Sequence, residues 1–218
     1  MVLRAPDAER LMLEGPAGGL EALIETPRIE GREGAPVAAF AVVCHPHPLH
    51  GGTLDNKVVY TLARACEHFG TPAIRFNFRG VGRSEGVYDE GRGETEDALA
   101  AIAYGRRRWP GAALWLGGFS FGGVVAVRAA AQARPTCVVA IAPGVTRIDA
   151  SGVAPPACPW LIVQGEADDV VPADTVLDWA RSLSPVPEIK LLAGAGHFFH
   201  GRINELRGAL LEFLETIP

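Results

Sequence analysis

The sequence predicts an α/β fold in which a mostly parallel sheet carries helices on both faces. Short apolar segments of strand length alternate with amphipathic segments of helix length, and several apolar segments are continuous rather than alternating. Continuous apolar runs are typical of parallel strands that are buried on both faces. The 218 residues, 48% of them hydrophobic, show no linker or repeat. We therefore expect residues 1–218 to form a single domain.

The strands are predicted in chain order from these apolar segments. The first two form an antiparallel pair over about residues 9–26, which includes LEALIE at 20–25. The later strands are predicted at residues 37–44, 73–78, 113–117, 137–142, 160–164 and 188–192.

Helices are predicted between the strands from the spacing of apolar residues. Residues 55–69 place apolar side chains on one face, and Gly70 supplies the stop. Residues 202–217 show the same spacing with Ile203, Leu206, Leu210, Phe213 and Leu214. Helices near 95–108, 121–133 and 173–183 complete the alternation.

Composition excludes several classes of partner. The net charge of −5 is small and spread along the chain, so we expect neither a nucleic-acid partner nor a membrane partner. The longest apolar run, at 37–44, is too short to cross a bilayer, and the first residues lack the apolar region of a secretory signal. We expect a cytoplasmic protein.

The four cysteines indicate no crosslink. They are scattered without a C-x-x-C pair, which argues against a zinc site and a disulfide framework. Each lies in an apolar stretch, where we expect it to pack as a small hydrophobic residue.

A glycine-rich segment around Ser120 is the first candidate for chemistry. GGFSFGG at 117–123 directly follows an apolar run and contains G-x-S-x-G at 118–122. Between a strand and a helix, this motif forms a sharp turn that exposes the serine hydroxyl. The alternative is a glycine-rich packing turn in which the serine is incidental.

An acid and a histidine follow Ser120 in the order that a catalytic triad on such a sheet requires. The acidic segment GEADDVVP at 165–172 follows one predicted strand, and AGAGHFFHG at 193–201 follows the last. Loops after parallel strands share one edge of the sheet, where α/β folds place their sites. Agreement of residue type, order and position favours catalysis over the packing turn.

These segments together resemble the α/β-hydrolase superfamily over nearly the whole chain. The resemblance is closest to a small, lidless bacterial group of serine hydrolases or esterases with an HPHP…GG…NK loop. It is carried by HPHPLHGGTLDNKVV at 45–59, FNFRGVGRSEG at 76–86, the Ser120 motif, VQGEADDVVP at 163–172 and GHFFHGR at 196–202. It implies an α/β-hydrolase fold.

The resemblance also implies roles for particular residues. The similar pattern G-x-x-D-x-x-V-P fits this chain without a gap and selects Asp168 as the triad acid, which leaves Asp169 as a solvated neighbour. Ser120 is then the nucleophile and His197 the base. We expect His200 to lie behind the site or at the surface.

Two backbone N–H groups are needed to stabilise the oxyanion of the tetrahedral intermediate. The residue after the nucleophile, Phe121, supplies one. The other comes from HPHPLHGG, where both prolines lack an N–H, which leaves His47 and Leu49. Comparison with the HG-x pattern of similar hydrolases favours His47, and proline in place of glycine at 46 keeps Leu49 open.

Two alternative hypotheses would require a metal or an organic cofactor. The three histidines His45, His47 and His50 suggest metal ligands, but no nearby carboxylate or cysteine completes a set. GVGRSEG at 80–86 has Glu85 where the dinucleotide motif requires glycine, and it looks more like the RG-x-G-x-S turn of hydrolases. We expect no metal and no organic cofactor.

The substrate cleft is expected to be open. Only about 15 residues, 143–157, occupy the interval in which many such folds carry a helical cap. An uncovered apolar cleft suits short acyl groups or an extended chain lying in a groove. Candidate wall residues are Phe119, Phe121, Tyr88, Val145, Phe198 and Phe199.

The sequence thus predicts a serine hydrolase, an enzyme that cleaves carboxylic esters of small substrates through an acyl-enzyme. Thioesters and peptides undergo the same acyl transfer, so a thioesterase or peptidase is the alternative within this class. A non-catalytic binding protein that kept the fold is the alternative outside it. The expected partner is a small-molecule ester or thioester, and the sequence leaves the oligomeric state open.

Overall fold

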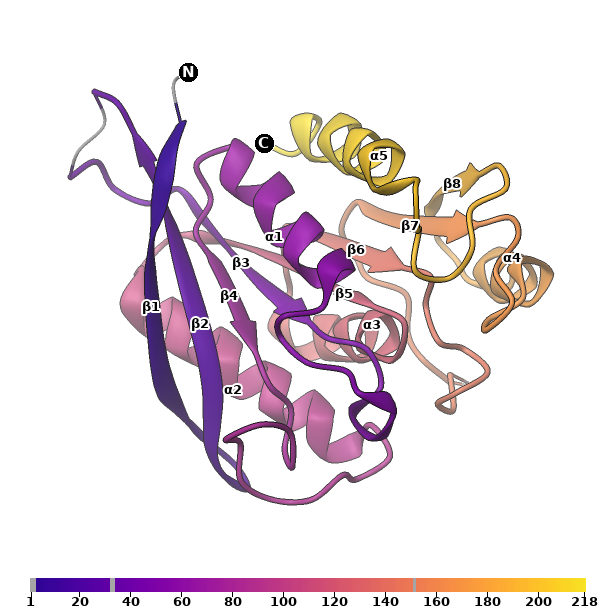
Figure 1. The fold of residues 1–218 in the computed structure, drawn as a ribbon, viewed down its shortest axis with the longest axis horizontal. Helices are drawn as coiled ribbons and strands as arrows, with labels where there is room; N and C mark the ends of the chain where they lie inside the picture. The colour runs from indigo at the N-terminus through magenta and orange to yellow at the C-terminus, as the bar shows by residue number, and fades with distance from the viewer. Residues whose placement is uncertain (1–2, 32–33, 151) are drawn as a thin grey trace.

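An eight-stranded sheet forms the centre of the molecule in the computed structural model, which describes residues 3–31, 34–150 and 152–218 (Figure 1). The strand order is β1-β2-β4-β3-β5-β6-β7-β8. The strands are β1 (Leu3–Gly15), β2 (Gly18–Ile29), β3 (Ala39–Cys44), β4 (Ala73–Phe76), β5 (Ala113–Phe119), β6 (Cys137–Ile141), β7 (Trp160–Gly165) and β8 (Glu188–Leu192).

Most of the sheet is parallel. From β4 to β8 every neighbouring pair runs parallel, whereas β1 pairs antiparallel with β2, and β2 pairs antiparallel with β4. All residues of β3, β4, β6 and β7 are buried. The continuous apolar runs of the sequence are therefore strands covered on both faces, as predicted.

Helices cover both faces of the sheet. Leu62 of α1 and Leu210 of α5 pack into one apolar cluster, and α1 and α5 are neighbours on that face (Figure 1). Helices α2, α3 and α4 pack into the other cluster, which includes Val124 and Val176. The helices are α1 (Lys57–His68), α2 (Arg92–Arg108), α3 (Phe121–Ala133), α4 (Ala173–Ser182) and α5 (Ile203–Glu215), with a short 3-10 helix η1 (Pro48–His50).

The N-terminal hairpin is longer than the apolar pattern predicts. We expected the antiparallel pair over about 9–26, and it extends from Leu3 to Ile29. The extra part carries charged residues such as Asp7 and Arg28, which form an exposed ion pair across the hairpin. Because these strand ends pair through polar groups, hydrophobic periodicity does not reveal them.

Three of the four cysteines pack as small hydrophobic residues, as predicted, and Cys158 is only partly buried. None of the four forms a disulfide, and Cys44, Cys66 and Cys137 are buried in the apolar clusters. Burial raises the pKa of each of these three thiols.

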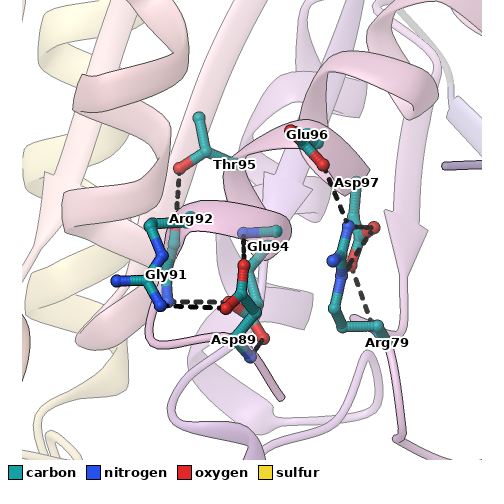
Figure 2. Close-up of polar contacts among 9 residues, drawn as sticks. Arg79, Asp89, Gly91, Arg92, Glu94, Thr95, Glu96 and Asp97 are labelled. Carbon is teal, nitrogen blue, oxygen red and sulfur yellow. Dashed lines mark hydrogen bonds and ion pairs between the residues drawn. The ribbon is translucent and has the colours of Figure 1, made fainter. Parts of the chain in front are cut away.

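A buried ion pair fixes the long loop between β4 and α2. Arg79 donates from Nε and Nη2 to the carboxylate of Asp97 on α2, and its backbone N–H donates to the same carboxylate at 2.9 Å (Figure 2). Near the start of α2, Glu94 accepts from the backbone N–H groups of Asp89 and Gly91. These contacts hold the segment that carries Tyr88.

The interval between β6 and β7 contains no helix or strand among its described residues. Ser151, which belongs to this predicted short connection, lies outside the described residues. Among the helices of the described chain, none is both long enough and apolar enough to cross a membrane.

Candidate active site

Ser120 occupies a sharp turn between β5 and α3. Its φ of 55° and ψ of −120° are a strained combination for a residue with a side chain. Its backbone N–H donates to the carbonyl oxygen of Ile141 at 2.8 Å, and its own carbonyl oxygen accepts from the backbone N–H of Gly144 at 2.9 Å. These bonds to the end of β6 and the loop after it hold the turn in place.

The two glycines of the motif are required by close backbone approach. A Cβ on Gly118 would overlap the backbone of Gly122, and a Cβ on Gly122 would overlap the carbonyl groups of Cys44 and His45. The strand, the turn and the start of α3 pass each other at distances that exclude side chains. This is the strand-turn-helix context that the sequence motif predicts.

Ser120, His197 and Asp168 form a hydrogen-bonded chain. His197 Nε2 lies 3.0 Å from Ser120 Oγ, and His197 Nδ1 lies 2.8 Å from Asp168 Oδ2. The three residues lie in loops after β5, β7 and β8, which meet at one edge of the parallel sheet. All three are buried, with 3 to 7% of their surface exposed.

The Asp168 carboxylate is held by further hydrogen bonds. Oδ1 accepts from the backbone N–H of Val170 at 2.9 Å and of Val171 at 2.8 Å. Burial alone would raise the pKa of Asp168, but the hydrogen bonds from His197 and from these two N–H groups lower it below its ordinary value. The carboxylate therefore stays charged beside the imidazole.

Gln164, at the end of β7, supports Asp168 and was not foreseen from the sequence. The side chain is fully buried, and its Nε2 donates to Asp168 Oδ2 at 3.0 Å and to the carbonyl oxygen of Val171 at 3.2 Å. With these contacts the carboxylate accepts hydrogen bonds on both oxygens. A glutamine in an apolar strand was the signal available, because a buried amide needs polar partners.

The neighbouring acids lie outside this chain of contacts. Asp169 is exposed, and Glu166 is also exposed and accepts from the backbone N–H of Gly194 at 3.1 Å. His200 is exposed, and its ring lies 5.9 Å from that of Phe198.

The loop after β3 lies next to the sharp turn at Ser120. It contains His47 and Leu49, the two candidates for the second N–H donor. Among the described residues, the backbone N–H groups of Phe121 and His47 have no hydrogen-bond acceptor. The N–H of Leu49 donates to His47 Nδ1 at 3.2 Å, and Leu49 itself is 67% exposed. Of the two residues left open in this loop, His47 thus has the available N–H.

His45 stabilises the loop after β3 through two contacts of its ring. The fully buried ring accepts from the backbone N–H of Phe78 at 2.9 Å and contacts the carbonyl oxygen of Pro46 at 2.6 Å. Because the first contact requires an unprotonated Nε2, the ring is neutral and donates from Nδ1. Burial lowers its pKa to about 4. In the described part of the chain, no three His, Cys, Asp or Glu side chains are arranged to hold a metal ion.

His47 contacts the β4–α2 loop. Its Nε2 lies 3.3 Å from the Tyr88 hydroxyl, and its ring packs 5.0 Å from the ring of Phe121. Burial lowers the pKa of His47, and electrostatic interactions with His50 and Arg147 lower it further. The Arg79–Asp97 ion pair thus supports the site indirectly, because it holds the loop from which Tyr88 contacts His47.

A cavity of about 220 Å³ opens onto Ser120 and His197. Phe198, His47 and the glycines that follow η1 line it, together with Asn56, Arg147 and Val170. Neither Asn56 nor Arg147 was singled out from the sequence, because the residue pattern does not show that the N-cap of α1 and the connection from β6 to β7 meet at this cavity.

The predicted wall residues divide into two groups. Phe198 lines the cavity. Phe119, Tyr88 and Val145 do not line it: Phe119 lies fully buried 4.9 Å from the His197 ring, Tyr88 contacts His47, and Val145 packs against the apolar cluster of α3. Phe121 and Phe199 are fully buried.

The sheet, the sharp turn at Ser120 and the loops that converge on it define the class of this protein as an α/β-hydrolase. Within that class, the chain belongs to the family described as serine aminopeptidase, S33, whose model matches residues 39–158.

Three proteins are similar to this chain over most of their length. An α/β serine hydrolase without lid from Xanthomonas campestris is 40% identical, with a TM-score of 0.91, over 100% of this chain and 99% of that one. An α/β serine hydrolase homologue from Coxiella burnetii is 41% identical, with a TM-score of 0.87, over 94% and 96% of the two chains. An uncharacterised protein from Rickettsia prowazekii is 39% identical over 87% of this chain and 85% of its own length.

Proposed function

We propose that this protein is a serine hydrolase that cleaves carboxylic esters of small substrates through an acyl-enzyme. The observation that carries the proposal is the hydrogen-bonded chain from Ser120 through His197 to Asp168, which ends at a cavity. A purely structural role would not need a strained, nearly buried serine in contact with an imidazole. The same observation weighs against a non-catalytic binding protein.

In the first half of the proposed reaction, Ser120 Oγ attacks the ester carbonyl carbon as His197 Nε2 takes the hydroxyl proton. Asp168 holds His197 in the tautomer that carries hydrogen on Nδ1 and stabilises the imidazolium that forms. The tetrahedral intermediate then collapses, the bond to the leaving alkoxide breaks, and His197 returns its proton to that oxygen.

In the second half, His197 takes a proton from water, and the resulting hydroxide attacks the acyl carbon. Collapse of this second intermediate breaks the bond to Ser120 Oγ, which recovers its proton from the imidazolium. The products are an alcohol and a carboxylic acid, and the sequence of steps uses no metal or organic cofactor.

The oxyanion of both intermediates is stabilised by the backbone N–H groups of Phe121 and His47. Both groups lack an acceptor among the described residues, and the Phe121 N–H belongs to the first turn of α3, where the helix dipole favours negative charge. The N–H of Leu49 already donates to the His47 ring, which supports His47 as the second donor.

The lining of the cavity favours an ester over an aminopeptidase substrate. An aminopeptidase must bind the α-ammonium group of its substrate, and a carboxylate is the natural partner for that charge. Among the described residues that line the cavity there is no aspartate or glutamate. A thioester, which needs no such carboxylate, remains the alternative within this reaction type.

The first prediction tests this function with 4-nitrophenyl butyrate. Ser120→Ala should lower kcat on the order of 10³- to 10⁶-fold, because only binding and the oxyanion donors remain. Ser182→Ala, which removes an exposed hydroxyl at the end of α4, should change kcat less than about twofold. Circular dichroism and urea unfolding establish that both variants fold. Turnover near the wild-type rate in Ser120→Ala would exclude the proposed nucleophile.

A further inference from the structure

The charge of the cavity points to a class of substrate. Arg147 is the one residue with a permanent charge among the described residues that line the cavity next to Ser120. It comes from the short connection between β6 and β7. A guanidinium presents several N–H donors in a planar fork that matches a carboxylate or a phosphate.

The Arg147 guanidinium is available to a ligand. Among the described residues, its one polar contact is a long one, 3.5 Å from Nη2 to the carbonyl oxygen of Val170, and no carboxylate forms an ion pair with it. By contrast, the buried Arg75 and Arg79 are each paired with a carboxylate, at 2.7 and 2.8 Å. Arg147 therefore has no structural partner that would neutralise its charge.

Further hydrogen-bond donors lie around the same cavity. Asn56 Oδ1 caps α1 by accepting from Val58 and Val59, while its Nδ2 has no acceptor among the described residues. The ring of His50 also lines the cavity, 4.5 Å from the ring of His47. An anion would thus find one cation and additional donors.

No carboxylate side chain is among the described residues that line the cavity. Asp168 is enclosed behind His197 and accepts hydrogen bonds on both oxygens. Asp169, the exposed neighbour of Val170, is not among the residues that line the cavity. The lowered pKa of His47, to which Arg147 and His50 contribute after burial, is consistent with a positive potential here.

We infer that the substrate is an anionic ester, in which a carboxylate or phosphate group binds Arg147 while the ester carbonyl lies at Ser120. This inference rests on the proposed function, because it names the substrate of the same site. It excludes a purely aliphatic ester as the preferred substrate, because such an ester would leave the guanidinium without a partner.

The test compares two matched pairs of esters. The first pair places the anion on the acyl side: 4-nitrophenyl hemiglutarate against 4-nitrophenyl hexanoate. The second pair places a phosphate on the alcohol side: 1-butyrylglycerol 3-phosphate against 1-butyrylglycerol. In each pair the measured quantity is the ratio of kcat/KM for the anionic ester to that for the neutral one, which cancels general effects on catalysis.

Arg147→Gln should lower this ratio about 10-fold or more for at least one pair, since hydrogen bonds to charged groups are among the stronger ones. Arg147→Lys should recover part of the ratio, because the charge remains but the planar fork is lost. Arg207→Gln removes the same charge from an exposed position on α5 and should leave the ratio unchanged. The pair that responds shows whether the site takes a carboxylate on the acyl side or a phosphate on the alcohol side, and an unchanged ratio in both pairs would overturn the inference.

A separate measurement distinguishes failure of this inference from failure of the proposed function. If the wild-type protein hydrolyses none of the four esters, the proposed function is wrong, and anion binding is then measured alone by calorimetry with glutarate and with glycerol 3-phosphate. Binding of either anion that is weakened about 10-fold by Arg147→Gln and unchanged by Arg207→Gln supports an anion site at Arg147. Absence of binding, or equal effects of both substitutions, contradicts it.

Discussion

At the scale of single residues, the orientation of His197 follows from its neighbours. Asp168 accepts from Nδ1, which leaves the lone pair of Nε2 directed at Ser120 Oγ. The carboxylate cannot turn away, because Val170, Val171 and Gln164 hold its two oxygens. In the proposed reaction, the imidazole is thereby oriented to accept a proton before any substrate binds.

The second prediction follows from the two adjacent acids. Asp168→Asn should lower kcat on the order of 10⁴-fold, because an amide at this position favours the wrong tautomer of His197. Asp169→Asn removes the same charge from an exposed side chain and should change kcat less than about twofold. Steady-state kinetics on one ester measures both. The reverse ranking would show that Asp169 orients the base.

The third prediction concerns His45 and acid. Its pKa is about 4 in the folded protein and about 6.5 in the unfolded chain. Between these values the unfolded state binds a proton that the folded state does not, so stability falls as pH decreases through this window. We expect His45 to remove about 2 kcal/mol of stability between pH 7 and pH 5.

Urea unfolding of the wild type and His45→Gln at both pH values measures this contribution. Glu67, whose pKa burial raises to about 7, has the opposite slope, because its folded state binds the extra proton. That slope is common to both proteins, so the difference between them isolates His45. Equal losses on going from pH 7 to pH 5 would show that His45 is not held neutral in the fold.

The sequence predicts only those residues of the candidate site that belong to a recognisable sequence motif. Ser120 has its glycines, and Asp168 and His197 follow strands in the required order. The roles of Gln164, Asn56 and Arg147 could not be predicted, because each role depends on which segments meet in space. For Gln164 the sequence showed only that an amide in an apolar strand needs a polar partner. The distances from Arg147 to Val170 and from Gln164 to Val171 are properties of the tertiary structure.

At the scale of elements, the turn between β5 and α3 depends on the absence of side chains. The fourth prediction is that Gly122→Ala destabilises the protein by about 3 kcal/mol, because its Cβ would meet the backbone of Cys44 and His45, which cannot move aside. Gly208→Ala is the matched control. It lies in α5 with no atom within 4 Å of the added Cβ.

The control should stabilise the protein by about 0.5 to 1 kcal/mol, because alanine favours a helix over glycine. Urea unfolding measures both changes in the free energy of unfolding. Equal stabilities of the two variants would mean that the close approach at Gly122 is relieved by backbone movement.

Elements with strong apolar patterns were predicted closely, and the segments ordered by polar contacts were predicted less well. The buried strands β3 and β7 lie within two residues of their predicted bounds. The start of α2 differs more, because its first turn is ordered by Glu94 and the loop before it rather than by an apolar face. The 3-10 helix after β3 was not predicted, since its three residues bury nothing.

At the scale of the whole molecule, the parallel sheet gathers the loops that carry chemistry. The loops after β3, β5, β7 and β8 bring His47, Ser120, Asp168 and His197 to one edge, although they are far apart in sequence. Both apolar clusters pack on this same sheet. We therefore propose that residues 1–218 fold as a single domain.

The cavity remains uncovered because the connection from β6 to β7 carries no helix among its described residues. In this arrangement specificity must come from the loops that line the cavity rather than from a cap. That gives Arg147, the one residue with a permanent charge among the described residues of the lining, a large share of substrate selection in the proposed reaction.

The most direct test of the account is covalent labelling by a fluorophosphonate, which reacts with a serine only where a base and oxyanion donors activate it. Intact-mass spectrometry and peptide mapping should find one adduct per chain, located on Ser120, absent from Ser120→Ala and formed much more slowly by His197→Ala. An adduct on another residue, or no adduct on a folded wild-type protein, would contradict the central claim that Ser120 is an activated nucleophile.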